Sequence, residues 1–225
     1  MSAPACLVAI VGPTASGKSE LAIRLAERLG GEIVACDSTQ VYRHFDIGTA
    51  KVPTAAQRGI PHHLVDIIEP GEVFTAGEYR RRAIEALEQI RRRGRLPILT
   101  VGTGLYLRAL LEGLSDAPGR SEELRERLRR RASKRGVEYL HRILRRLDPA
   151  TAARIAERDA QKVIRAIEIC VLARKPAAEL YREARPGLPG FEAVKVGLNP
   201  AREELCARID RRVEAMVASG WVEEV

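Results

Sequence analysis

The residues with the clearest chemical signature form the sequence GPTASGKS at positions 12–19. This segment fits the pattern G-x-x-x-x-G-K-[ST], in which glycines let backbone N–H groups surround phosphate oxygens at the start of a helix. The Lys18 ammonium adds a positive charge, and the Ser19 hydroxyl is a suitable ligand for Mg²⁺. The segment therefore predicts a phosphate or diphosphate site formed by Gly12, Pro13, Thr14, Ala15, Ser16, Gly17, Lys18 and Ser19.

A second group of candidate residues follows two later hydrophobic runs. Asp37 comes after the run 33–36, and Gly102 and Thr103 come after the run 96–101. In a parallel sheet, residues that follow the strands meet in the crevice beyond the carboxyl ends. A nucleotide-hydrolysing protein usually has a carboxylate after a hydrophobic strand to help hold Mg²⁺, and the second run is followed by none. The pattern instead favours a reaction in which phosphate leaves and Asp37 acts as a base toward an acceptor.

These residues depend on strands and helices that alternate along the chain. Short apolar runs are typical of strands buried on both faces, whereas leucine and alanine at spacings of three and four predict helices. The expected strands are 7–11, 33–36, 96–101 and 194–198. The expected helices are about 21–29, 77–94, 105–114 and a last helix from about 202 that runs to the end of the sequence without a stop signal. Such alternation predicts a parallel sheet with helices on both faces.

One segment of the chain carries the whole excess of positive charge. The protein has a net charge of +8, and residues 120–185 hold 19 Lys and Arg against 10 Asp and Glu. Only helical patterns occur between 121 and about 182, with breaks at Gly136 and at Asp148-Pro149. Concentrated positive charge favours nucleic acid as a partner, although a set of solvated arginine-rich helices would give the same count.

The predicted fold class is therefore α/β: a P-loop NTPase-like parallel sheet flanked by helices, with an inserted all-helical basic domain. The core is expected at 1–115 and 186–225, with the insertion at 116–185. The 225 residues are 45% apolar and 30% charged, which supports a folded core, and no apolar run approaches the roughly 18 residues of a membrane helix. Four separated cysteines favour reduced thiols in a cytoplasmic protein. The adjacent His62 and His63 are not expected to converge on one metal ion.

Longer stretches of sequence are more specific than the phosphate motif. They are GPTASGKS at 12–19, DSTQVYRHFDIGTAK at 37–51, GIPHHLVDIIEP at 59–70, VGTGLYLRALLEGL at 101–114, DAQKVIRAIEI at 159–169 and CARIDRRVEAMVASGW at 206–221. In this order they resemble the tRNA dimethylallyltransferases, also called tRNA isopentenyltransferases. Because that family usually continues for many tens of residues past Val225, the resemblance also implies a chain shortened at its C-terminus.

The resemblance implies transfer of a dimethylallyl group from dimethylallyl diphosphate to the N6 amine of the adenine beside the anticodon in tRNA. It implies Mg²⁺ as the cofactor, held at Ser19, and a monomeric cytoplasmic enzyme that binds the anticodon stem-loop and no membrane. Asp37 matches the general base, Arg208 the diphosphate-facing arginine and Thr103 a residue near the reacting centre. The implied tRNA contacts are Asp37, Ser38, Thr39, Gln40, Thr103, Arg125, Gln161, Lys162, Val163, Ile164 and Arg165.

The residues by themselves leave other interpretations open. A P-loop small-molecule or nucleoside kinase would use ATP and an arginine-rich lid, for which residues 120–185 could be mistaken. An adenylate prenyltransferase acting on free AMP or ATP would need no basic insertion of this size. A non-catalytic RNA-binding module would keep the phosphate site for structural reasons only. Asp37 and Thr103 could also be simple helix caps, and Arg208 could lie on a solvated helix face.

Overall fold

The structure is a computed structural model that describes residues 3–115, 117–182 and 187–225. The chain forms two compact units: Met1–Gly113 together with Pro186–Val225, and Leu114–Arg185. The insertion predicted at 116–185 begins and ends on residues that lie outside the described ranges. Each unit has its own hydrophobic core, and each is described separately below.

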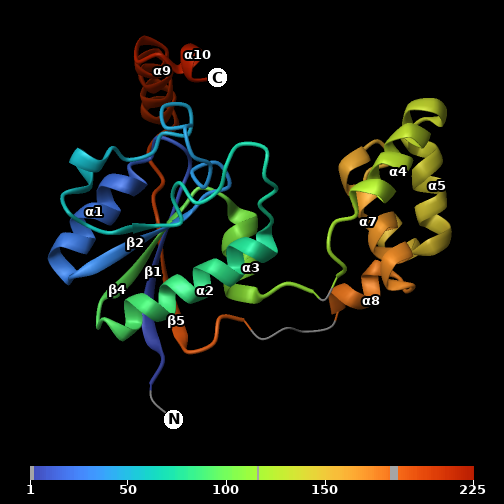
Figure 1. Cartoon of the computed structure of the whole chain (residues 1–225), viewed down its shortest axis with the longest axis horizontal. Helices are drawn as coiled ribbons and strands as arrows, with labels where there is room; N and C mark the ends of the chain where they lie inside the picture. The colour runs from blue at the N-terminus through green and yellow to red at the C-terminus, as the bar shows by residue number, and fades with distance from the viewer. Residues whose placement is uncertain (1–2, 116, 183–186) are drawn as a thin grey trace. The chain divides into compact units, whose positions relative to one another are not determined.

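The first unit is built on a five-stranded sheet in which every strand runs parallel to its neighbours (Figure 1). The strand order is β3-β2-β4-β1-β5. This confirms the predicted α/β class, and the expected strands all form. The edge strand β3 was missed because two residues are too short to show any periodicity. The strands are β1 (Ala5–Val11), β2 (Gly31–Cys36), β3 (His62–His63), β4 (Leu96–Val101) and β5 (Phe191–Gly197).

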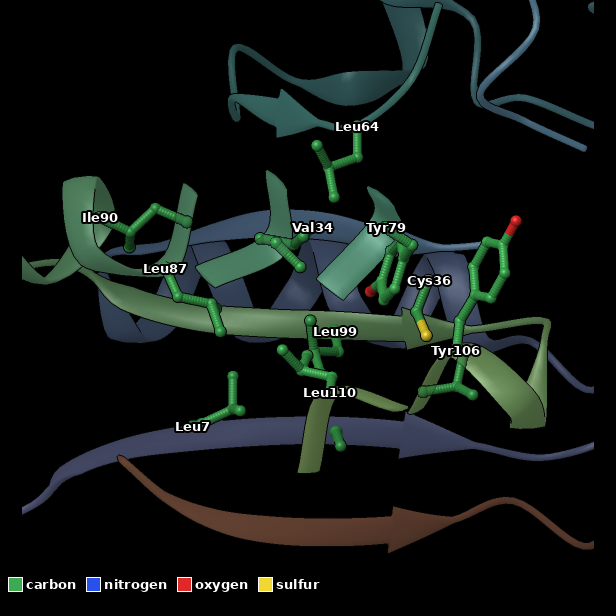
Figure 2. Packing of buried hydrophobic residues seen from close by; sticks show 13 residues of the cluster. Leu7, Val34, Cys36, Leu64, Tyr79, Leu87, Ile90, Leu99, Tyr106 and Leu110 are labelled. Atoms are coloured by element: carbon green, nitrogen blue, oxygen red, sulfur yellow. The ribbon is translucent and has the colours of Figure 1, made fainter. Parts of the chain in front are cut away.

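Helices cover both faces of this sheet. On one face, α1 (Lys18–Leu29) packs against a cluster that includes Ile10 and Ile98. On the other face, α2 (Ala76–Arg92) and α3 (Gly104–Glu112) cover a cluster around Leu7 and Leu99 (Figure 2). Neighbouring residues of a strand point to opposite faces, so the continuous apolar runs in the sequence supply both clusters. Since the helices after β1 and β4 lie on opposite faces, a crevice opens beyond these two strands.

The C-terminal region differs from the single helix that the sequence predicts. The helix α9 (Arg202–Ala218) ends at Ser219, and Gly220 has a left-handed φ of 92° before the short helix α10 (Trp221–Glu224). Glycine adopts this conformation without a steric cost, so the helix ends at Ser219-Gly220. The sequence patterns did not predict this stop signal. Both helices lie beyond the carboxyl ends of the strands (Figure 1).

The described part of the second unit is all-helical, as predicted. Breaks occur at Gly136, which has a φ of 83°, and at Asp148, whose carboxylate accepts hydrogen bonds from the N–H groups of Thr151 and Ala178. Its core contains Leu140, Leu144 and other apolar side chains from all five helices of the unit. The helices are α4 (Glu122–Arg135), α5 (Val137–Leu147), α6 (Pro149–Ala152), α7 (Ala160–Ala173) and α8 (Ala177–Arg182).

Among the described residues of both units, no helix combines the length and apolar character needed to cross a membrane.

Candidate active site

The phosphate motif forms the turn between β1 and α1. Gly17 has a left-handed φ of 94°, and a Cβ on Gly12 would lie 2.8 Å from the carbonyl oxygen of Leu198, so both positions require glycine. The Lys18 ammonium donates hydrogen bonds to the carbonyls of Gly12 (2.9 Å) and Pro13 (2.7 Å). The loop therefore closes around the lysine, and the N-terminus of α1 points into the space beyond the sheet.

A cavity of about 660 Å³ lies over this loop. It brings the phosphate motif together with Asp37 from the end of β2, Gly102 from the end of β4, and Arg208 from α9. These residues are far apart in the sequence and meet because parallel strands end at the same edge of the sheet. Gln40, Thr100 and the segment 49–53 complete its walls.

The cavity contains more positive than negative groups. The pKa of Lys18 lies below its usual 10.5, chiefly because the ammonium is partly buried and next because the Arg212 guanidinium repels it, while Asp37 opposes the shift. Arg208 forms an ion pair with Glu204 at 2.5 Å. Sequence reasoning selected Arg208 and missed Arg212, although their spacing of four on one helix was the available signal. Such a site favours a polyanion such as diphosphate.

Asp37 and Thr103 are held by hydrogen bonds that do not belong to helix caps. Asp37 Oδ1 accepts from the N–H (2.8 Å) and the hydroxyl (2.7 Å) of Thr39. Thr103 precedes α3, yet its hydroxyl makes no cap bond and instead accepts from Ser38 N–H at 2.9 Å and donates to Ser38 Oγ at 3.1 Å. Thr103 therefore stands at the N-cap position of α3 without capping it through its side chain, and Asp37 caps no helix. The Thr103 and Ser38 hydrogen bonds tie the segments after β2 and β4 together.

Gly102 controls how close Asp37 can approach this edge of the sheet. A Cβ at this position would overlap Asp37 Oδ2 and lie 2.9 Å from its Cγ. The N–H of Gly102 and that of Thr103 both donate to the carbonyl of Cys36, at 3.0 and 2.9 Å. The carboxylate therefore rests directly on the glycine backbone, one residue beyond the buried strand.

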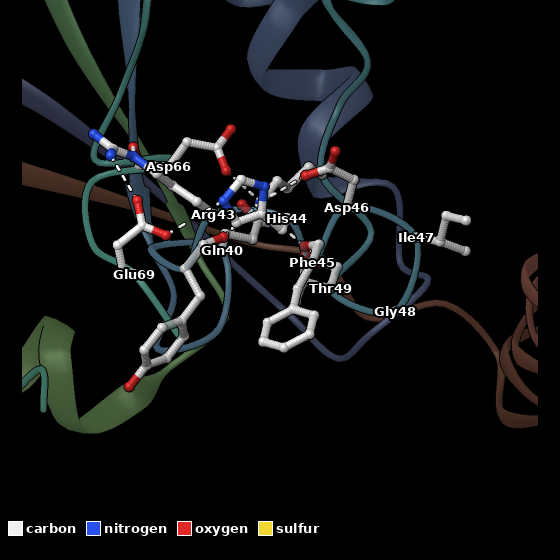
Figure 3. Close-up of polar contacts among 12 residues, drawn as sticks. Gln40, Arg43, His44, Phe45, Asp46, Ile47, Gly48, Thr49, Asp66 and Glu69 are labelled. Carbon is white, nitrogen blue, oxygen red and sulfur yellow. Dashed lines mark hydrogen bonds and ion pairs between the residues drawn. The ribbon is translucent and has the colours of Figure 1, made fainter. Parts of the chain in front are cut away.

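Gln40 and residues 49–51, at the two ends of the segment 40–51, form another wall. Figure 3 shows this segment, which a buried lysine holds in shape. The Lys51 side chain is only 5% exposed, and its ammonium binds the carbonyl of Tyr42 and the carboxylates of Asp46 and Asp66. The Gln40 amide donates to backbone carbonyls of the same segment. Lys51 was missed as a site residue, although it closes the DSTQVYRHFDIGTAK stretch that carried the resemblance.

The residues of the second unit that were predicted to contact tRNA differ in their exposure. Gln161 and Lys162 are exposed, whereas Val163 and Ile164 are buried in the core, and the contact of these residues with RNA stays a prediction. On a helix that packs one side on a core, residues at spacings of three and four face inward, and Val163 and Ile164 lie on that side together with Ile167 and Cys170.

Arg125 and Arg165 are committed to an internal network centred on Glu168. The Glu168 side chain is fully buried and accepts from Arg125 Nε and Nη2 at 2.9 Å, from Arg165 Nη1 at 2.6 Å and from Ser121 N–H at 2.8 Å. Burial alone would raise the pKa of Glu168, but these hydrogen bonds outweigh it and lower the pKa to about 2. Arg125 therefore joins α4 to α7. Arg165 lies on α7 with Glu168 and also donates to the carbonyl of Pro118, which precedes α4.

A groove of about 300 Å³ on the second unit offers a different basic surface. It is lined by Arg131, Lys134, Arg135 and Tyr139, and the Arg135 guanidinium lies 5.0 Å from the Tyr139 ring centre. Arg142 lies over the same ring at 5.9 Å. Arginine beside an aromatic ring suits phosphate and base contacts in RNA, and the run RERLRRRASKR was the signal that could have identified it.

The two adjacent histidines have separate partners in the first unit. His63 Nε2 lies 2.7 Å from the Glu32 carboxylate, and His62 Nδ1 lies 2.9 Å from the carbonyl oxygen of Ile60. They form part of the sheet edge at β3.

Comparison with known proteins places this arrangement in a family. Residues 40–225 match the family model described as IPP transferase. The tRNA dimethylallyltransferase of Solibacter usitatus is 56% identical over 97% of the chain and 71% of the relative, and that of Koribacter versatilis is 56% identical over 100% and 73%.

Solved structures agree with this family assignment. A tRNA isopentenylpyrophosphate transferase from Bacillus halodurans is 41% identical, with a TM-score of 0.64 over 97% of this chain and 68% of that one. A eukaryotic dimethylallyltransferase acting on tRNA is 29% identical, with a TM-score of 0.84 over 98% of this chain and 55% of that one. The chain belongs to the IPP transferase family.

Proposed function

We propose that this protein transfers the dimethylallyl group of dimethylallyl diphosphate to the N6 amine of the adenine adjacent to the anticodon in tRNA. The relatives named above support tRNA as the substrate. The observation that carries the chemistry is that one cavity joins the phosphate loop to a carboxylate, Asp37, that caps no helix. A prenyl transfer needs both features. The phosphate loop binds the diphosphate that leaves, and the carboxylate serves the amine that attacks.

The phosphate side of the cavity stabilises the leaving group. When the bond between the allylic carbon and oxygen breaks, the electron pair stays on the diphosphate and negative charge grows on its bridging oxygen. Lys18, the N–H groups of the loop, and Arg208 with Arg212 provide positive charge at this position. Each preorganised donor of this kind contributes about 3 kcal/mol to transition-state stabilisation.

The carboxylate side of the cavity serves the acceptor. An adenine amine is a weak nucleophile because its lone pair is delocalised into the ring. As the new bond from N6 to carbon forms, the amine must lose a proton, and Asp37 takes it. Oδ1 is fixed by Thr39, so Oδ2, which rests on Gly102, is the oxygen directed to this task.

The lining of the cavity fits a magnesium ion. Its hydroxyl and carboxylate oxygens, from Ser19, Thr100 and Asp37, form an oxygen-only donor set with no thiol or imidazole. Ser19 and the oxygens of a bound diphosphate would hold Mg²⁺, which would neutralise part of the charge on the leaving group.

The second unit supplies the electrostatic attraction for RNA. The excess of positive charge lies in residues 120–185, and the groove at Arg131 and Tyr139 combines cations with an aromatic ring. We assign this unit to the anticodon stem-loop, from which the adenine leaves its stack to reach Asp37. We further propose that the protein acts as a monomer in the cytoplasm.

Product analysis tests this proposal. The protein is mixed with Mg²⁺, dimethylallyl diphosphate and unmodified tRNA, and the digested RNA is searched for prenylated adenosine by mass spectrometry. A tRNA with uridine in place of the anticodon-adjacent adenine is the matched control. Prenylated adenosine in the first tRNA and none in the control is the expected result.

Parallel reactions separate the alternatives. Phosphate released from ATP, with no prenylated product, would establish a kinase. Prenylated AMP in preference to tRNA would establish an adenylate enzyme. RNA binding without any affinity for inorganic pyrophosphate would leave only a binding module.

A further inference from the structure

The helix that carries Arg208 and Arg212 has little packing of its own. None of the residues of α9 is buried, and Val213 and Val217 are 44% and 51% exposed. A helix in a globular protein is normally held by burial of an apolar face, and of the apolar side chains of α9 only Leu205, Ile209 and Met216 are even half-buried. Some other contact must therefore hold the two arginines over the phosphate loop.

The facing wall does not supply that packing directly. A second cavity of about 600 Å³ separates α9 from the loop 46–57, with Ile47 and Lys51 on the loop side and Arg212 and Met216 on the helix side. Because this space lies between the helix and the loop, their side chains do not pack against one another across it.

One carboxylate from α10 bridges the walls. Glu224 Oε1 accepts hydrogen bonds from the N–H groups of Asp46 at 2.6 Å and Ile47 at 2.7 Å, and Oε2 accepts from Gly48 N–H at 2.9 Å. Three successive N–H groups directed at one anion form a strong, charge-assisted set of bonds. The ribbon at 46–48, to which these bonds run, is visible in Figure 3.

The indole of Trp221 closes the same contact. A Cβ on Gly48 would overlap Trp221 Nε1 and lie 2.8 Å from its Cδ1, so the ring rests on the glycine backbone. The left-handed Gly220 turns the chain between α9 and α10 and so returns both side chains to the loop.

We propose that α10 is a latch that ties α9 to the loop 46–48 through Glu224 and Trp221, and so positions Arg208 and Arg212 around a bound diphosphate. Glu224 is a positioning residue that touches no substrate. The inference rests on the proposed function only in taking diphosphate as the ligand.

The contacts continue from the latch to the cavity wall. Asp46, which Glu224 holds by its N–H, accepts a hydrogen bond from Lys51 through its carboxylate at 2.7 Å. Burial raises the pKa of Glu224, but the three N–H groups and the Lys51 charge outweigh it, so the pKa lies below its usual value. The carboxylate is therefore ionised and bonded under ordinary conditions.

The test compares Glu224→Ala with Glu223→Ala, a matched control at an exposed neighbour. Backbone hydrogen exchange is measured at 46–48 and along α9, together with affinity for inorganic pyrophosphate. In Glu224→Ala, exchange at both segments rises at least about tenfold as the bonds are lost. Pyrophosphate affinity falls about tenfold because the arginines lose their place. The control changes neither.

A second variant examines the contact that Trp221 makes with Gly48. Gly48→Ala leaves the carboxylate intact but displaces the indole, and Trp221 is the single tryptophan of the chain, so its fluorescence reports the displacement. A shift in its emission together with faster exchange in α9 is expected.

Two results would overturn the inference. Unchanged exchange in α9 in both variants would show that the latch does not hold the helix. Faster exchange with unchanged pyrophosphate affinity would show that it does not position the arginines. If the wild-type protein binds no pyrophosphate, the proposed function fails, while exchange in α9 still decides whether the latch exists.

Discussion

The two oxygens of Asp37 have different surroundings, and this difference is the basis of its assigned role. Oδ1 accepts two hydrogen bonds from Thr39, which fix the orientation of the carboxylate. Oδ2 rests on Gly102, where no side chain intervenes. A base that must take a proton from a weak nucleophile benefits from such fixed orientation, because little rearrangement is needed in the transition state.

Replacing the carboxylate tests the base directly. Asp37→Asn keeps an oxygen to accept from Thr39 but cannot take a proton at neutral pH. We expect the single-turnover rate of prenyl transfer to fall by about 10² or more, with pyrophosphate affinity retained. Asp210→Asn, an exposed carboxylate on α9, is the control and should leave the rate unchanged. Near-normal turnover by Asp37→Asn would remove Asp37 from the mechanism.

Gly102 and Gly104, two positions apart, test the placement of this carboxylate. In Gly102→Ala the new methyl group overlaps Oδ2, so we expect Asp37 to move and the rate to fall by about 10². Gly104→Ala is the matched control, because no atom lies within 4 Å of its added Cβ and alanine suits the first turn of α3. The rates come from the same prenyl-transfer assay. Equal rates for the two variants would contradict the close approach.

At the scale of elements, Glu168 joins α4 to α7 through Arg125 and the N–H of Ser121. Its pKa is lowered to about 2, so the ionised form stabilises the fold above about pH 4.5 and this contribution is lost as pH falls from there toward 2. A shift of this size corresponds to about 3 kcal/mol at neutral pH. The buried network therefore makes the second unit sensitive to acid.

Glu168→Gln should lower the free energy of unfolding of the second unit by about 3 kcal/mol at pH 7. Calorimetry should show a similar difference at pH 7 and pH 5 and a smaller one at pH 3, because the Glu168 carboxylate of the unfolded wild-type chain becomes protonated below about pH 4.5. Glu157→Gln removes an exposed ion pair to Arg145 and should change stability by less than about 1 kcal/mol. A constant difference across the pH range would exclude the ionised network as its source.

The elements that the sequence predicted are those with a local pattern. The four longer strands and the main helices have apolar periodicities, and Gly136 and Asp148 mark real breaks. By contrast, β3 is defined by its pairing with β2, and the contact of α10 runs from Glu224 to a loop far away in the sequence. No local pattern contains such partners.

The same distinction applies to the site. Residues at strand ends, such as Asp37, were identifiable because topology gathers them at one edge. The ion pair of Arg125 could not be predicted because its partner, Glu168, is a buried carboxylate on another helix. Val163 and Ile164 were included as neighbours of polar residues, and helical geometry turns them inward.

At the scale of the whole molecule, charge divides between the two units. Residues 120–185 carry the full positive excess, and the remaining residues hold 19 Lys and Arg against 20 Asp and Glu. Many of the basic side chains are paired with carboxylates, so the count of 19 Lys and Arg overstates the number of cations that RNA can meet. Arg131 and Lys134, which line the groove beside Tyr139, form no ion pair within the described residues.

Unpaired cations should therefore dominate the salt dependence of tRNA binding. Each phosphate that a cation neutralises releases counterions and contributes about 0.7–0.9 to the slope of log affinity against log salt concentration. The double variant Arg131→Ala, Lys134→Ala should lower this slope by about 1 to 2 and weaken binding at low salt. The control, Arg145→Ala with Arg158→Ala, removes the same charge from residues paired with Glu157 and Glu138. Binding titrations over a range of salt concentrations should show a smaller change of slope for the control. The two arginines of the control are already neutralised by their carboxylates in the wild-type protein. Equal changes of slope in the two double variants would show that RNA responds to net charge and not to the groove.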